Sequence, residues 1–220
     1  YVGVVASIVG IPLDAVAEAT DEQFAAKPKA VALNKSAVIA GFEWAEANLD
    51  KQQRYRLEPS TAAKGKILIE GNESTAIGLM FGGATFLSWY PITPSSSVCE
   101  SLGKYFKRYR HDPETGKATY AVLQAEDELG ALAMVLGASW VGARAVTATS
   151  GPGLSLMSEL AGLSYFAEIP AVIVDVQRMG PSTGLPTRSA QGDILKGYFL
   201  SEYILLHVLV VDTFFVSDFP

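Results

Sequence analysis

The sequence is poor in the residues that hold metals and clusters. Its 220 residues include one cysteine, Cys99, and two histidines, His111 and His207. A single thiol cannot form an internal disulfide, and it cannot by itself hold an iron–sulfur cluster or a zinc ion. The two histidines have no further ligands at metal spacing and do not support a Ser-His-Asp arrangement. We therefore expect no metal site on this chain and a reducing, cytoplasmic environment.

Positive charge is also scarce. Lys and Arg total 17 against 23 Asp and Glu, so the formal net charge is −6 and the pI is about 5.0. An acidic chain lacks the basic surface that nucleic acids require. The one basic cluster comprises Lys104, Lys107, Arg108 and Arg110, and we interpret it as the solvated end of a helix. Nucleic acid is therefore not an expected partner.

Long hydrophobic runs are missing as well. Residues 198–219 are apolar and aromatic, but Glu202, His207 and Asp212 interrupt them, and a spanning helix needs about 20 mostly apolar residues. The chain begins at Tyr1 without an initiator Met and without the pattern of a signal peptide. We expect a fragment of a longer protein, with no membrane role.

The first part of the chain has a helical pattern. Hydrophobic residues make up 49% of the whole sequence, enough for a sizeable core. Residues 1–49 are rich in alanine, with Pro12 near a helix start and a further helix expected at 33–48. Residues 50–65 are charged and contain Pro59, and their hydrophobic residues follow neither the helical nor the strand repeat. We therefore expect a linker and a domain boundary there.

From residue 66 onward, short apolar runs alternate with helical stretches. We expect strands at 66–70, 85–90, 119–123, 144–149 and 171–176, and helices at 72–84, 95–109, 127–141 and 154–167. Such alternation predicts an α/β fold in which crossover helices cover both faces of a parallel sheet. We place this domain at 66–196 and treat 197–220 as a divergent apolar tail.

Polar segments follow three of the expected strands, at 90–96, 124–128 and 149–153. Because the carboxyl ends of parallel strands meet at one edge of a sheet, these segments could form half of a cofactor site. The Thr-Ser-Gly-Pro-Gly run at 149–153 could point backbone N–H groups at an anion or a polar ring. It matches neither the Walker pattern nor G-x-G-x-x-G, and a plain strand-to-helix turn explains it equally well.

Glu128 opens a helix whose next residues, 129–134, are all uncharged. Its carboxylate is therefore expected to enter a small apolar environment, where desolvation favours the protonated form and sharing of a proton with a bound heterocycle. The alternative is that Glu126 and Asp127 cap the helix and Glu128 is merely favourable in its first turn. Composition alone favours this alternative.

Arg178 follows the apolar strand and leads into the Gly- and Pro-containing run 180–187. An arginine there could clamp the carboxylate of a small acidic substrate through two parallel hydrogen bonds. The alternative is a surface salt bridge beside a loop.

Together these segments resemble the α chain of 2-oxoacid:ferredoxin oxidoreductases, in the form that carries a fused γ-type domain ahead of it. The resemblance covers 2–196 and assigns 1–49 to the C-terminal remnant of the γ-type domain. Its strongest elements, in order along the chain, are Gly71-Asn72-Glu73, 90–96, Glu126-Asp127-Glu128, 148–153 and 174–178 through Gln191-Gly192-Asp193.

The resemblance implies that 66–196 is the pyrimidine-binding domain for thiamine diphosphate. Glu128 matches the catalytic glutamate that hydrogen-bonds the aminopyrimidine ring. Thr93, Arg178 and Thr187 match positions near the substrate, with Arg178 holding the carboxylate and Thr187 shaping the pocket. The implied cofactor-binding set is Pro91, Ile92, Thr93, Glu128, Ser150, Gly151 and Pro152.

The resemblance further implies a partner β subunit that carries Mg²⁺ and an iron–sulfur cluster, because this chain lacks the Gly-Asp-Gly…Asn pattern that holds the diphosphate. The implied reaction is oxidative decarboxylation of a 2-oxoacid to an acyl-CoA, with coenzyme A as co-substrate and ferredoxin as acceptor. The 180–187 run favours 2-oxoglutarate over pyruvate. Two alternatives remain: a truncated, non-catalytic assembly module that only binds the partner subunit, and an unrelated nucleotide-binding domain suggested by the Gly-Pro-Gly loop alone.

Overall fold

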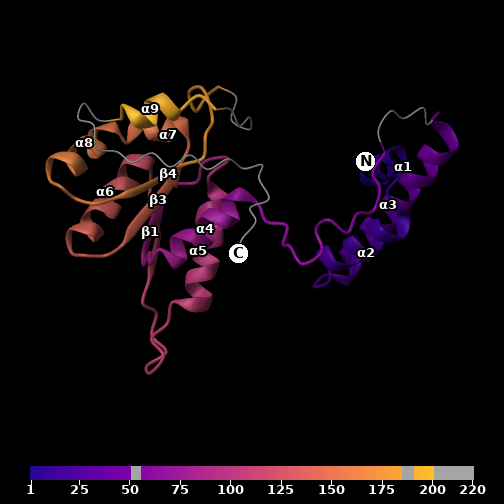
Figure 1. Cartoon of the computed structure of the whole chain (residues 1–220), viewed down its shortest axis with the longest axis horizontal. Coiled ribbons are helices and arrows are strands. Elements are labelled where there is room, and N and C mark those ends of the chain that lie inside the picture. The colour runs from indigo at the N-terminus through magenta and orange to yellow at the C-terminus, as the bar shows by residue number, and fades with distance from the viewer. Residues whose placement is uncertain (51–55, 185–190, 201–220) are drawn as a thin grey trace. The chain divides into compact units, whose positions relative to one another are not determined.

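The computed structural model describes residues 1–50, 56–184 and 191–200. The chain divides into two compact units, residues 1–67 and 68–220 (Figure 1). Thr187 and the tail from residue 201 lie outside the described residues. In the part of the chain that is described, no helix is long and apolar enough to cross a membrane.

The first unit consists of the helices α1 (Val2–Val9), α2 (Leu13–Gln23) and α3 (Pro28–Asn48). Pro12 immediately precedes α2, as expected. The helix expected at 33–48 begins earlier, at Pro28, because proline suits the first helical position, where its missing N–H has no partner to lose.

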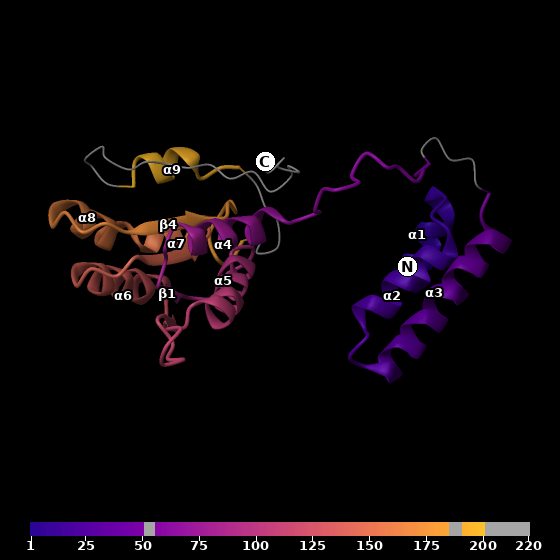
Figure 2. The same cartoon turned by 60° about the horizontal axis from the view of Figure 1, so that its bottom comes forward.

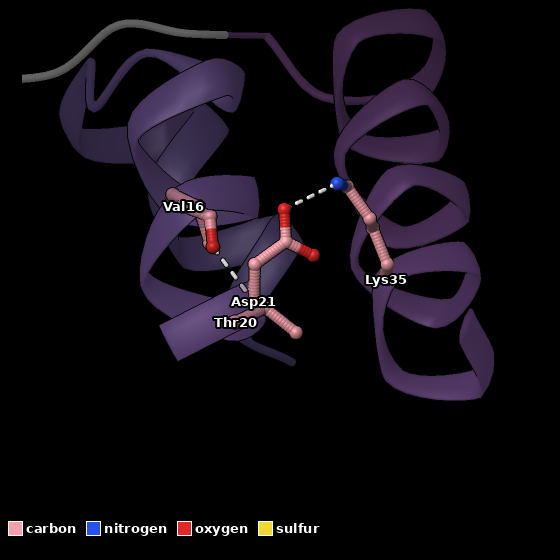
Figure 3. Close-up of polar contacts among 4 residues, drawn as sticks. All are labelled: Val16, Thr20, Asp21 and Lys35. Carbon is pink, nitrogen blue, oxygen red and sulfur yellow. Dashed lines mark hydrogen bonds and ion pairs between the residues drawn. The ribbon is translucent and has the colours of Figure 1, made fainter. Parts of the chain in front are cut away.

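A polar contact joins α2 to α3 (Figure 3). Lys35 Nζ lies 2.7 Å from Asp21 Oδ2, and Thr20 Oγ1 donates to the carbonyl of Val16 at 2.7 Å. Both charged side chains are more than a third exposed, at 37% and 47%, so solvent screening limits the pair to at most about 1 kcal/mol. The ion pair therefore contributes little to holding α2 on α3.

The second unit is built on a four-stranded parallel sheet in the order β2-β1-β3-β4. Its strands are β1 (Phe86–Trp89), β2 (Ala121–Gln124), β3 (Ala145–Thr149) and β4 (Val172–Asp175). Its helices are α4 (Gly71–Phe81), α5 (Ser96–Tyr109), α6 (Glu128–Trp140), α7 (Gly151–Leu156), α8 (Ser158–Phe166) and α9 (Ile194–Tyr198). The parallel α/β fold is thus confirmed.

Helices cover both faces of this sheet (Figures 1 and 2). On one face α4 and α5 pack against alternate strand residues such as Leu87 and Val146. On the other face α6 and α8 pack against the strand residues in between, such as Phe86 and Ala145, which precede Leu87 and Val146 in the sequence. This alternation is the period-2 pattern of a strand that is buried on both sides. Cys99 lies in the first of these cores, and burial raises the pKa of its thiol to about 12, so the thiol is chemically inert.

Two expected elements differ in the structure. No strand forms at 66–70, so that expectation is wrong: Leu68 is 93% exposed, and the apolar run finds no sheet to join. The single helix expected at 154–167 is instead two helices, α7 and α8, which meet at the fully buried Met157. The first of them begins already at Gly151, because Pro152 is tolerated in a first helical turn.

Candidate cofactor and substrate site

The strand order places a topological switch point between β1 and β3. From β1 the chain crosses to β2 on one side, and then returns past β1 to reach β3 on the other. In open parallel sheets, ligands bind in the crevice outside the carboxyl ends of the strands at such a point. The loops that follow β1 and β3 are 90–95 and the turn at Ser150, which are two of the polar segments singled out in the sequence.

Three of the loops meet at the carbonyl oxygen of Thr93. Ser150 Oγ, after β3, donates to this oxygen at 3.1 Å, and Arg178 Nη1, after β4, donates to it at 2.9 Å. The structure therefore brings Thr93, Ser150 and Arg178 together. Arg178 is only 3% exposed, so the alternative of a surface salt bridge beside a loop does not hold.

The loop after β1 is held in place from α4 and from its own residues. Asn72 Nδ2 donates to the carbonyl of Pro94 at 3.0 Å and to Ser97 Oγ at 2.7 Å. The Thr93-Pro94 peptide bond is cis. Ile92 is buried, whereas Pro91 and Thr93 are exposed. The Gly71-Asn72-Glu73 motif thus acts on the site through Asn72, a role that sequence reasoning did not assign.

Asp127, and not Glu128, caps helix α6. Asp127 Oδ1 accepts a hydrogen bond from the backbone N–H of Gly130 at 2.6 Å. The Glu128 side chain turns inward instead and is 6% exposed. Among the described residues, no donor forms a hydrogen bond or ion pair with its carboxylate. Because the carboxylate has no protein donor among these residues, this position suits a ligand that supplies one.

The first turn of α7 lies directly against Glu128. A Cβ atom placed on Gly153 would lie 2.0 Å from Thr149 Oγ1, 2.7 Å from Glu128 Cγ and 3.1 Å from Glu128 Oε1. Only a glycine at position 153 lets the α7 backbone lie this close to Thr149 and Glu128. Within the described chain, Thr149 Oγ1 is also buried without a hydrogen-bond partner. The 149–153 turn therefore lies in contact with both Thr149 Oγ1 and the Glu128 side chain.

The other expected site residues lie as follows. Ser150, Gly151 and Pro152 are buried at the start of α7. Thr187 lies outside the described residues. No group of three or more His, Cys, Asp or Glu side chains suited to a metal ion occurs in the described ranges.

Sequence reasoning missed two residues that hydrogen-bond the backbone of Arg178 and of Gly151. Asp193 Oδ2 accepts a hydrogen bond from the backbone N–H of Arg178 at 3.0 Å, and Lys196 Nζ donates to the carbonyl of Gly151 at 2.8 Å. The Gln191-Gly192-Asp193 motif is visible in the sequence, but spacing alone cannot show which loop it reaches.

Near these residues, Asp175 at the end of β4 has a carboxyl pKa well above its ordinary value. Burial, and after it the negative charge of Asp193, raise the pKa of its carboxyl from 3.8 to about 7 against the opposing positive charge of Lys196. In the described chain its Oδ1 is buried without a hydrogen-bond partner. Below pH 7 the folded protein therefore holds a proton here that the unfolded chain releases at about pH 4.

We expect Asp175→Asn to stabilise the chain in a pH-dependent way. Because the folded pKa is raised, the contribution of Asp175 to stability is fully present below pH 3.8 and is lost as pH rises towards about 7. The uncharged amide avoids that loss. The variant should match the parent near pH 4 and exceed it by about 1–2 kcal/mol at pH 8, allowing for partial exposure. Urea unfolding at both pH values measures this, and a difference independent of pH would contradict it.

Comparison with known proteins points to one family. The family described as pyruvate flavodoxin/ferredoxin oxidoreductase, thiamine diphosphate-binding, matches residues 77–210 and so continues past Lys196. Over 147 residues the chain is 47% identical to 2-oxoacid:ferredoxin oxidoreductase 1, subunit alpha, of Sulfurisphaera tokodaii, covering 66% of this chain and 23% of that protein. Over 184 residues it is 39% identical to 2-oxoglutarate oxidoreductase subunit KorA of Mycobacterium tuberculosis, covering 81% of this chain and 27% of that protein.

A solved structure agrees with these relatives. The 2-oxoglutarate:ferredoxin oxidoreductase of Magnetococcus marinus, with 2-oxoglutarate, coenzyme A and succinyl-CoA bound, superposes with a TM-score of 0.68 at 36% identity, covering 89% of this chain and 33% of that one. The chain thus spans about a quarter to a third of the proteins it matches. With its parallel sheet, its switch-point loops and the buried Glu128, this chain belongs to the pyruvate flavodoxin/ferredoxin oxidoreductase family and contains that family's thiamine diphosphate-binding domain.

Proposed function

We propose that this chain forms the pyrimidine-side half of a thiamine diphosphate site in a 2-oxoacid:ferredoxin oxidoreductase. The observation that carries the proposal is Glu128, a residue that is 6% exposed and whose side chain lies against the first turn of α7. Among the described residues it has no donor of its own, and an aminopyrimidine N–H would supply that donor.

The described residues fit this cofactor. When bound, thiamine diphosphate supplies the carbanion chemistry of 2-oxoacid decarboxylation. Glu128 would hold or accept a proton at its carboxylate, and Gly153 keeps the approach to that carboxylate open. Ile92, Ser150, Gly151 and Pro152 would form the wall beside it, with Pro91 and Thr93 at its exposed rim.

We further propose that Thr93 and Arg178 bind the 2-oxoacid, with Thr187 completing the pocket. The guanidinium of Arg178 is already oriented by its bond to the Thr93 carbonyl, which lowers the entropy cost of engaging a carboxylate. The KorA relative and the solved structure with bound 2-oxoglutarate favour 2-oxoglutarate as the substrate. The succinyl-CoA in that structure supports coenzyme A as co-substrate.

The partners follow from what the sequence can supply. One cysteine cannot hold a cluster, so we propose a β subunit that carries the Mg²⁺ and the iron–sulfur centre, with ferredoxin as acceptor and the cytoplasm as location. The relatives named as alpha subunits support such a partner. We retain residues 1–49 as the remnant of a γ-type domain and 50–65 as a linker. Of residues 197–220, expected to be a tail, 197–210 fall within the family match.

The test is reduction of a viologen dye by the full-length chain co-expressed with its β partner. We expect reduction that requires both 2-oxoglutarate and thiamine diphosphate, and that is slower with pyruvate. Absence of thiamine-dependent reduction on either acid, from a stable and cluster-loaded complex, would contradict the proposal.

A second candidate is a non-catalytic assembly module that only binds the partner subunit. Exposed apolar side chains favour it: Trp140, Val141 and Phe166 are 69%, 83% and 86% exposed, and such surface is typical of an interface. This candidate predicts stable association with the β subunit whether or not Glu128 is intact, and no thiamine-dependent turnover.

A further inference from the structure

The segment that contains Asp193 contacts two of the loops that form the candidate site. Asp193 is 6% exposed and stands at the start of α9, distant in sequence from both of the loops that it contacts. Its Oδ2 accepts the hydrogen bond from the buried backbone N–H of Arg178 at 3.0 Å. Its own N–H donates to Gln177 Oε1 at 3.4 Å, so the contact with this loop is made in both directions.

The same carboxylate also packs on the turn after β3. A Cβ atom on Gly151 would lie 2.4 Å from Asp193 Oδ1, 2.5 Å from Asp193 Oδ2 and 2.4 Å from the carbonyl oxygen of Arg178. Asp193 therefore lies within contact distance of Gly151 and Arg178 together. A side chain at residue 151 would force these groups apart.

Lys196 makes a second connection from the same helix. Its Nζ donates to the carbonyl of Gly151 at 2.8 Å, and residues three apart lie on one face of a helix. Asp193 thus engages the loop after β4 while Lys196 engages the turn after β3. These are the two loops whose Arg178 Nη1 and Ser150 Oγ converge on the carbonyl oxygen of Thr93.

We propose that Asp193 is a positioning residue which, together with Lys196, sets Arg178 and the Ser150-Gly151 turn around the carbonyl of Thr93. Neither residue needs to touch the substrate. The inference rests on the proposed function for its kinetic consequence, because Arg178 and Thr93 are the groups assigned to the 2-oxoacid. Its structural content is independent of that function.

The physical reason is that the Arg178 N–H is buried and donates to a side chain rather than to a strand neighbour. Removal of the Asp193 carboxylate leaves a buried donor without its acceptor and opens space beside Gly151. The Arg178 backbone can then shift, and the guanidinium shifts with it. A misplacement of about 1 Å in a binding or catalytic group can cost roughly 10²-fold in rate.

The first test is hydrogen exchange on the whole chain, which needs neither cofactor nor activity. In Asp193→Ala we expect exchange of the Arg178 amide to accelerate by at least about 10-fold, while strand β3 keeps its protection. Asp193→Asn retains an acceptor oxygen and should restore most of the protection. Unchanged Arg178 exchange in the alanine variant would overturn the proposal, whatever the enzyme assays show.

The second test is steady-state kinetics in the assembled complex. We expect Asp193→Ala to raise the KM for 2-oxoglutarate by about 10-fold or more, with a smaller change in the thiamine diphosphate requirement, and Asp193→Asn to recover most of the loss. A merely structural role would lower stability without this split or this recovery. If the wild-type complex shows no thiamine-dependent turnover, the proposed function fails, and hydrogen exchange alone decides the positioning role.

Two further variants keep the test decisive. Lys196→Met removes one bond at a half-buried position, so it should fold even if Asp193→Ala does not, and we expect it to raise the same KM by about 3-fold. Asp112→Ala is the matched control: Asp112 Oδ1 also accepts a backbone bond, from Thr115 at 2.7 Å, in the loop between α5 and β2 at the opposite edge of the sheet. Wild-type KM in Lys196→Met, or an equal rise in Asp112→Ala, would overturn the proposal.

Discussion

Replacing Glu128 by glutamine is expected to lower thiamine-dependent turnover of the assembled enzyme by about 10²–10⁴-fold, the range spanned by the loss of a general acid or base. Glutamine has nearly the same shape, so the helix start and the cap from Asp127 to Gly130 should survive. What is lost is the negative charge and the ability to exchange a proton at a site that is 6% exposed. Thermal unfolding should change little.

The measurement is viologen dye reduction at saturating 2-oxoglutarate, with subunit association checked by size-exclusion chromatography. Glu126→Gln is the matched control, because Glu126 is exposed and stands two positions earlier, in the loop before α6. It should retain parental turnover. Parental turnover in Glu128→Gln would remove Glu128 from its assigned role, and equal losses in both variants would point to a general disturbance of the loop.

Gly153→Ala is expected to destabilise the chain by about 1–3 kcal/mol, the usual cost of forcing extra volume into a packed interior. The added Cβ would lie 2.0 Å from Thr149 Oγ1 and 2.7 Å from Glu128 Cγ. Thr149 belongs to a fully buried strand and has little freedom to move. Glu128 must therefore be displaced, so turnover should fall together with stability.

Urea unfolding and dye reduction of the same preparations measure the two effects. Gly162→Ala in α8 is the matched control, since a Cβ added at Gly162 would meet no atom within 4 Å, and alanine in a helix interior should stabilise by about 0.5–1 kcal/mol. A Gly153→Ala variant as stable as the parent would show that α7 does not press on Glu128.

The elements of the second unit were largely predictable because their signals are local. Buried parallel strands such as 145–149 are short apolar runs, and alternation with helices implies a parallel sheet before any contact is known. The 66–70 run shows the limit of this reasoning. Its composition resembles a strand, but a strand exists only where a neighbour offers hydrogen bonds, and none of the described residues does so here.

The candidate site was predictable to a similar degree. Its location at the carboxyl edge was expected from the order of motifs, whereas the sequence left open whether the Glu128 side chain enters an apolar environment or stays in the exposed first turn; the structure buries it. A glutamate in a first helical turn can face solvent or the interior, and only the close approach of Gly153 decides between them. The contact made by Asp193 was likewise invisible, since its partner Arg178 is set by the return path of the chain.

The sequence by itself determined the class of fold, the family and the identity of the chemical groups, because these depend on residue type and on order along the chain. Tertiary structure alone decided which groups meet. The order β2-β1-β3-β4 brings the loops after β1, β3 and β4 to one carbonyl, that of Thr93. Such convergence depends on contacts between residues far apart in sequence, and chain spacing carries no information about them until the sheet is assembled.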